Sequence, residues 1–353
     1  MTVALAALSA LVAFVMAVGL LDQWRDRRRP YQALWAVGMV LFGIASACEA
    51  IGAAAGWSGA LFRTWYLAGA VLNVAWLGLG TAFLLARTRF GYAFALGVAL
   101  GGLLTIASQA SHKYPDVGPV PFVYLIVALV IALAIGVMTY LEDDRWPRLA
   151  AVGVLAATVV GAFLVAGATL PDAIALDPHG VPVLEPLPGA LRLLTPLTNV
   201  AGALSLFLGA LFSAYVFMPK KRVLGYSLDA RQSGDNFLFN LLIGGVAIIV
   251  NFFASLPGAA VALVRGRLHS RVPATLLIAL GAIFVSGTDL GVKDGATTVF
   301  ELSKLVGVSL IFAGFLVSTE TFRELRVPFT DRRFGDSRDE PPESQDAVRA
   351  DAK

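Results

Sequence analysis

The stretch that decides the fold is residues 32–54, QALWAVGMVLFGIASACEAIGAA, in which Glu49 is the only charged side chain. This run is long enough to cross a bilayer, because about 20 apolar residues in a helix span the hydrocarbon. Similar apolar blocks recur along a chain that is 58% hydrophobic and only 14% charged, whereas soluble domains carry about 25% charged residues. The sequence therefore predicts an all-α, polytopic helical integral membrane protein whose first partner is the lipid bilayer.

The blocks also predict how the chain is organised. We expect hydrophobic segments at residues 2–21, 32–54, 64–86, 91–109, 121–140, 149–170, 195–217, 237–264, 273–289 and 301–319. This pattern predicts a seven-helix membrane bundle over 1–217, a cytoplasmic loop at 218–236 and further membrane segments over 237–322. The last residues, 323–353, are charged and nearly free of apolar groups, and we expect them to be disordered.

Charge in the breaks predicts the orientation. The first, third, fifth and seventh breaks carry more Lys and Arg than the breaks between them, and short cytoplasmic loops retain basic residues. We therefore expect an external N-terminus and residues 218–236 in the cytoplasm, in the plasma membrane of a prokaryote.

The segment 237–264 leaves two topologies open. A single crossing would put the basic residues that follow it on the external side, against the charge rule. A re-entrant hairpin turning at residues 255–258 would remove the conflict and leave nine crossings and a cytoplasmic tail; ten plain crossings is the alternative. Asn240, Asn251 and Ser255 fall on one side of a helix here, which predicts a re-entrant or packing stripe facing protein or water.

Glu49 is a carboxylate inside a membrane segment. It lies about 27 Å along a helix that starts at the cytoplasmic side, so we place it near the external boundary. Two interpretations follow: an ion pair with Arg63 across a short turn, or a carboxylate that faces an external cavity and binds a cation or a proton. Further along, Glu301 and Lys304 can pair along their own helix.

Polar side chains collect in the outer part of several segments. Arg63, Tyr66 and Asn73 recur at steps that place them on one helix face. The candidate outward-facing pocket consists of Ser46, Glu49, Arg63, Tyr66, Asn73 and Asn199. The Pro- and Gly-rich break at 171–194 is expected to form an external loop above it, either idle or acting as a lid. For Asn73 and Asn199, hydrogen bonding between helices is the alternative interpretation.

The sequence contains no Walker sequence, Ser-His-Asp set or His/Asp metal cluster, so we assign no catalytic residue, metal or cofactor, and no nucleic-acid partner. Two functions are favoured over a membrane enzyme. One is a carrier or binding protein for a small or lipid-like molecule, and the other is a receptor-like or accessory subunit that acts with a partner membrane protein.

Overall fold

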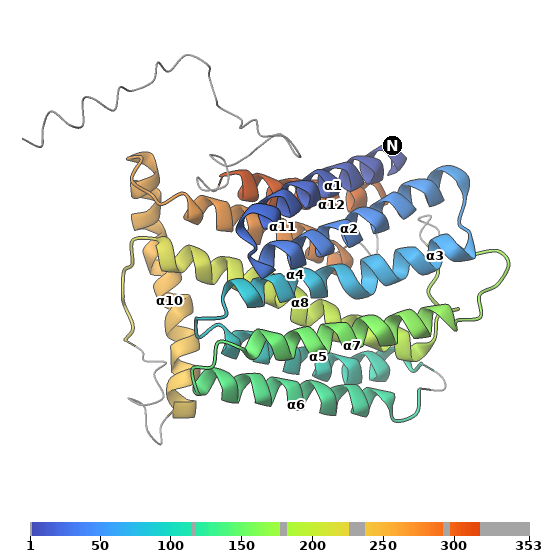
Figure 1. The fold of residues 1–353 in the computed structure, drawn as a ribbon, viewed down its shortest axis with the longest axis horizontal. Helices are drawn as coiled ribbons and strands as arrows, with labels where there is room; N and C mark the ends of the chain where they lie inside the picture. The colour runs from blue at the N-terminus through green and yellow to red at the C-terminus, as the bar shows by residue number, and fades with distance from the viewer. Residues whose placement is uncertain (1, 115–116, 177–181, 226–236, 292–296, 318–353) are drawn as a thin grey trace, which may run out of the picture.

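The structure, a computed structural model, describes residues 2–114, 117–176, 182–225, 237–291 and 297–317 (Figure 1). Its elements in chain order are α1 (Thr2–Arg27), α2 (Pro30–Ala55), α3 (Gly59–Trp65), the π-helix η1 (Tyr66–Leu72), α4 (Asn73–Leu84), α5 (Gly91–His112), α6 (Val120–Tyr140), α7 (Trp146–Ala166), α8 (Gly189–Phe217), α10 (Phe237–Val264), α11 (Arg271–Gly291) and α12 (Thr297–Val317). Within the described residues, nine helical stretches are long and apolar enough to cross a membrane. The predicted all-α polytopic bundle is confirmed. The tail at 323–353 lies outside the described residues.

A proline and a glycine mark the two ends of α2. Pro30 is the first residue of α2, where its missing N–H costs nothing because the first helical N–H groups have no partner within the helix. Gly56 ends the helix with φ +89 and ψ 162, and its N–H donates to the carbonyl of Gly52. A positive φ strains residues with a Cβ, so glycine suits this stop.

Figure 1 shows α1 to α8 lying side by side, with α11 and α12 against them rather than apart. α12 packs on α1, and α11 packs on α8. One apolar core joins these elements, and Leu20, Met39, Val308 and Ile311 are among its buried members. The C-terminal pair α11–α12 therefore shares its core with the N-terminal helices.

Close contact between α4 and α8 depends on two glycines. A Cβ on Gly202 would lie 2.3 Å from the carbonyl oxygen of Val74, and a Cβ on Gly78 would lie 2.6 Å from the Cα of Gly202. Real Cβ atoms do not approach backbone atoms so closely, so the helices pack backbone to backbone only because both residues are glycine.

The helix α10 corrects the expected hairpin. It runs without a break from Phe237 to Val264 and keeps Pro257 inside it, so the turn expected at residues 255–258 is wrong. A proline within a helix removes one hydrogen bond and does not have to reverse the chain. The chain turns later, where Gly266 has φ +64.

The placement of α10 also differs from a plain crossing. Figure 1 shows α10 lying across the ends of the other helices, beside the end of α8. Ala214 and Met218 at the end of α8, Ala259 of α10 and Val272 at the start of α11 share one buried cluster. α11 therefore starts at the end of the bundle where α8 stops, and the chain gets there without α10 running parallel to its neighbours.

Side chains of the expected polar stripe anchor α10 to the segment after α8. Asn251 Oδ1 accepts from the backbone N–H groups of Val223 at 2.7 Å and Leu224 at 3.0 Å, and its Nδ2 donates to the Leu224 carbonyl at 2.8 Å. The N–H of Lys221 donates to Ser255 Oγ at 2.9 Å. Asn251 and Ser255 are fully buried, whereas Asn240 is only half-buried. Two of the three residues thus have a packing role.

The loop before α8 is shorter than expected. α8 begins at Gly189 and holds Pro196 in its second turn, so the helix starts six residues before the predicted segment at 195. Leu184 and Leu187 pack onto the core formed by α3, η1, α7 and α8. Residues 177–181 lie outside the described part of the loop.

Candidate functional site

The π-helix η1 interrupts the third predicted segment. In a π-helix the backbone bonds run from residue i to i+5, so each turn holds more residues than an α-turn. Side chains spaced for one α-helical face therefore rotate apart. Arg63 precedes η1, Tyr66 opens it and Asn73 follows it, and the structure directs these three toward different neighbours.

Arg63 donates hydrogen bonds to backbone carbonyl groups at the end of α7. Its Nε donates to the carbonyl of Val165 at 3.2 Å, and its Nη2 donates to the carbonyl of Ala168 at 2.7 Å. The last carbonyls of a helix have no partner within it, and a guanidinium offers several donors. The expected ion pair between Glu49 and Arg63 is wrong, because the partners of both side chains lie elsewhere.

Glu49 binds a lysine from the far end of the chain. Lys304 Nζ of α12 donates to Glu49 Oε2 and also to Glu301 Oε1 at 3.0 Å. The Nε1 of Trp65 donates to Glu49 Oε1 at 2.9 Å. The expected pairing of Glu301 with Lys304 is confirmed, and we call Glu49, Glu301 and Lys304 the charged triad.

Glu301 and Lys304 of the charged triad are buried, and Glu49 is largely so. The side chains of Glu49, Glu301 and Lys304 are 15%, 6% and 8% exposed. The sequence contained both halves of the triad, but nothing in the spacing showed that α12 would lie opposite α2, because 255 residues separate Glu49 from Lys304. The contact between Glu49 and Lys304 joins α2 to α12 inside the bundle.

Tyr66 and the remaining candidates are separate from the triad. The Tyr66 hydroxyl lies 2.9 Å from Thr195 Oγ1 of α8. Asn199 is four residues further along α8, and its buried Oδ1 has no hydrogen-bond partner among the described residues. Ser46 is buried on α2. No hydrogen bond or ion pair described for these side chains joins two of the six predicted pocket residues.

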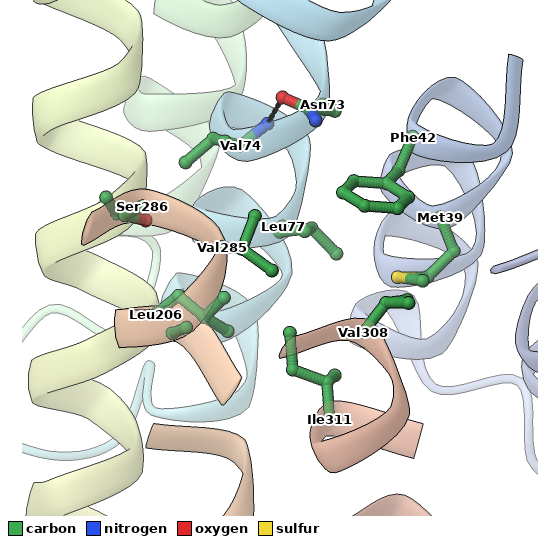
Figure 2. A pocket seen from close by; sticks show the side chains of 12 residues that line it. Met39, Phe42, Asn73, Val74, Leu77, Leu206, Val285, Ser286, Val308 and Ile311 are labelled. Atoms are coloured by element: carbon green, nitrogen blue, oxygen red, sulfur yellow. Dashed lines mark hydrogen bonds between the residues drawn. The ribbon is translucent and has the colours of Figure 1, made fainter. Parts of the chain in front are cut away.

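A cavity does lie between α2, α4, α8, α11 and α12 (Figure 2). The space that is free of protein atoms is about 400 Å³ with open solvent included, but the enclosed part that could hold the centre of a water-sized sphere is only about 20 Å³. Its lining residues are Met39, Phe42, Asn73, Val74, Leu77, Ala203, Leu206, Ala282, Val285, Ser286, Val308 and Ile311. We call it the central cavity, and Asn73 is the only residue of the predicted pocket that lines it.

The lining of the central cavity is apolar except for two polar side chains, Asn73 and Ser286. Asn73 is buried and Ser286 is exposed, so the two mark the deep end and the rim. Asn73 Oδ1 accepts from the N–H of Val74 at 2.5 Å, the contact drawn as a dashed line in Figure 2. No described residue accepts a hydrogen bond from its Nδ2, which is therefore available to a ligand. The lining residues missed from sequence come from α2, α4, α8, α11 and α12. All of them except Ser286 are apolar, and an apolar side chain in a membrane segment gives no signal for a cavity.

Comparisons of the chain with protein-family models, with curated proteins and with solved structures gave no match. The described residues contain no group of three or more His, Cys, Asp or Glu side chains that could hold a metal ion. The assignment of a function therefore depends on the geometry of the central cavity and the charged triad.

Proposed function

We propose that the protein is a carrier or binding protein that holds a small, lipid-like molecule in the central cavity, within the membrane. The observation that carries the proposal is the lining of this cavity: ten apolar side chains, with the amide of Asn73 and the hydroxyl of Ser286 as polar groups. Ligand pockets typically combine apolar walls with a few placed polar groups. The enclosed space here is only about 20 Å³, room for about one water molecule, so the helices around it would have to move apart to admit a ligand. A short apolar chain that ends in one hydrogen-bonding group matches this lining.

The position of the cavity also supports the proposal. It is bounded by α2, α4 and α8 on one side and by α11 and α12 on the other, so a small movement between these two sets of helices would change its volume. The lining residue Asn73 directly follows η1, and π-helical turns within helices are frequent at functional sites.

A receptor-like or accessory subunit is the second candidate, and α10 favours it. Leu242 and Val264 of α10 are 73% and 89% exposed, and Phe239 and Phe253 are also exposed. A partner membrane protein could cover this apolar surface. Elution of the purified protein only together with another chain would favour the subunit, and a ligand-dependent rise in unfolding temperature of the isolated protein would favour the carrier.

Photolabelling tests the cavity directly. An octanol that carries a diazirine has an apolar chain and one hydroxyl, and it can be activated on the purified protein in lipid nanodiscs. We expect labelled peptides from α2, α4 and α12. Ala203→Leu adds three carbons to the cavity wall and should reduce this labelling at least tenfold, and Asn73→Leu should weaken it by removing the amide donor.

The matched control is Ala156→Leu, which makes the same change at an exposed position of α7. It should leave labelling of α2, α4 and α12 unchanged. Equal labelling of the Ala203→Leu and Ala156→Leu proteins, or labelling confined to outward-facing positions, would show that the cavity is not a binding site.

A further inference from the structure

The charged triad carries an imbalance of charge inside the bundle. With all three groups ionised, two carboxylates face one ammonium, and the net charge is negative. The side chain of Glu301 is 6% exposed, and its Oε2 is buried without a hydrogen-bond partner among the described residues. A buried, unpaired carboxylate oxygen is costly because the lost hydration is not replaced.

We propose that the charged triad is a proton-binding site, with the proton held on Glu301 Oε2. Binding forms one O–H bond and converts the Glu301 carboxylate to a neutral carboxylic acid. Glu49 stays an anion and Lys304 stays a cation, so the triad changes from one net negative charge to none. No other bond forms or breaks, and the proton comes from water.

The contacts favour Glu301 over Glu49 as the group that takes the proton. Glu49 accepts from both Lys304 and Trp65, and two donors stabilise a carboxylate. Glu301 accepts only from Lys304 among the described residues. The ammonium also lies 4.4 Å from the centre of the Phe300 ring, within the range of a cation–π contact.

Neighbouring elements add little charge to the site. α1 packs on α12 and has no ionisable side chain from Thr2 to Leu21. On α2 the adjacent group is the buried thiol of Cys48. The Arg63 guanidinium is engaged at the end of α7. The side chain of Asp289 on α11 lies outside the described side chains.

A metal cation fits this site less well than a proton. Lys304 Nζ is 3.0 Å from Glu301 Oε1, so a second cation at Glu301 would be repelled at close range. A proton on Glu301 Oε2 cancels the excess negative charge at the one carboxylate oxygen of Glu301 that has no partner among the described residues. The chemistry of the triad therefore favours H⁺ over Na⁺.

The triad lies on the same helix faces as the central cavity. Phe42 precedes Glu49 by seven residues on α2, and Val308 follows Glu301 by seven residues on α12; seven residues are about two turns. Proton binding removes repulsion between the carboxylates of α2 and α12 and should draw together two walls of the cavity. The proton site itself does not depend on the cavity having a ligand.

Infrared difference spectroscopy on the full chain in nanodiscs tests the site. At pH 7, exposed carboxylates, with pKa values of about 4, are ionised. In the wild-type spectrum minus the Glu301→Gln spectrum the ester C=O bands of the lipid cancel, so the C=O stretch of a buried carboxylic acid can be seen. We expect that band in the wild type and its loss in Glu301→Gln. Glu49→Gln should also lose it, because Lys304 then balances Glu301 alone. The two variants keep the shape of the side chain, and either one suffices if the other fails to fold.

Glu142→Gln is the matched control, because Glu142 pairs with Arg89 and its side chain is 56% exposed. It should keep the band. Two results would overturn the proposal: a wild-type spectrum at pH 7 without a band that depends on Glu301, or a rise in unfolding temperature when Na⁺ replaces choline that is present in the wild type and absent in Glu301→Gln. The second result would identify a sodium site.

Discussion

Replacing Lys304 with methionine removes the only cation of the charged triad and keeps most of the side-chain volume. The ammonium contacts Glu49 and Glu301, and all three side chains are at most 15% exposed. Removing one partner of a buried ion pair leaves an uncompensated charge, which costs about 3–5 kcal/mol. Lys304→Met should therefore lower the free energy of unfolding by about 4 kcal/mol.

Equilibrium unfolding in mixed micelles measures this loss, with Arg87→Met as the control. Arg87 pairs with Asp144 on the surface, where the two side chains are 87% and 54% exposed, and exposed pairs contribute at most about 1 kcal/mol.

A triple variant separates lost charge balance from lost packing. Adding Glu49→Gln and Glu301→Gln to Lys304→Met removes every charge of the triad, and replacing a whole buried ionic group is often nearly neutral. We expect the triple variant to recover most of the stability that the single variant loses. A Lys304→Met protein within 1 kcal/mol of the wild type, or a triple variant as unstable as the single one, would refute the reasoning.

Two further predictions concern packing. Gly202→Ala should cost about 1–3 kcal/mol in the same unfolding assay, because its Cβ would meet the α4 backbone. Gly136→Ala, at a helical position with nothing within 4 Å of the added Cβ, should be neutral or stabilising by up to about 1 kcal/mol; equal losses in both would contradict the close α4–α8 contact. Asn251→Ala should speed tryptic cleavage after residues 220–222, since three hydrogen bonds to the backbone of Val223 and Leu224, directly after these sites, are lost. Asn240→Ala should leave the cleavage rate unchanged, and a rate equally unchanged in Asn251→Ala would show that this amide does not anchor the segment.

The helical membrane architecture could be predicted because it depends on local composition. Runs such as residues 32–54 are too apolar for a water-facing surface, and breaks with Pro or Gly mark their ends. The stripe on the eighth segment was also readable: Asn251 and Ser255 share a face, and the structure buries both. The spacing of these residues predicted which face of the helix is buried. It did not predict that the helix lies across the end of the bundle, because hydropathy gives no information on the angle between helices.

The candidate site was harder to predict because its contacts are distant in sequence. From sequence, Arg63 was the nearest cation to Glu49. In the structure Arg63 instead donates to backbone carbonyl groups at the end of α7, and Glu49 accepts from the Lys304 ammonium of α12. The insertion of η1 turned Asn73 toward the central cavity, and a change from α- to π-helical turns leaves no mark in an apolar sequence. Which helices face each other was the missing information.

Thiol accessibility tests the existence of the central cavity most directly. Cys48 is the only cysteine, so Cys48→Ser gives a background in which Asn73→Cys places one thiol in the cavity, and Ser205→Cys places one at a buried position of α8 that does not line it. We predict that a small membrane-permeant methanethiosulfonate modifies Asn73→Cys at least tenfold faster than Ser205→Cys, and that octanol slows the reaction. Equal, slow modification of both thiols would contradict the cavity and the function we propose for it.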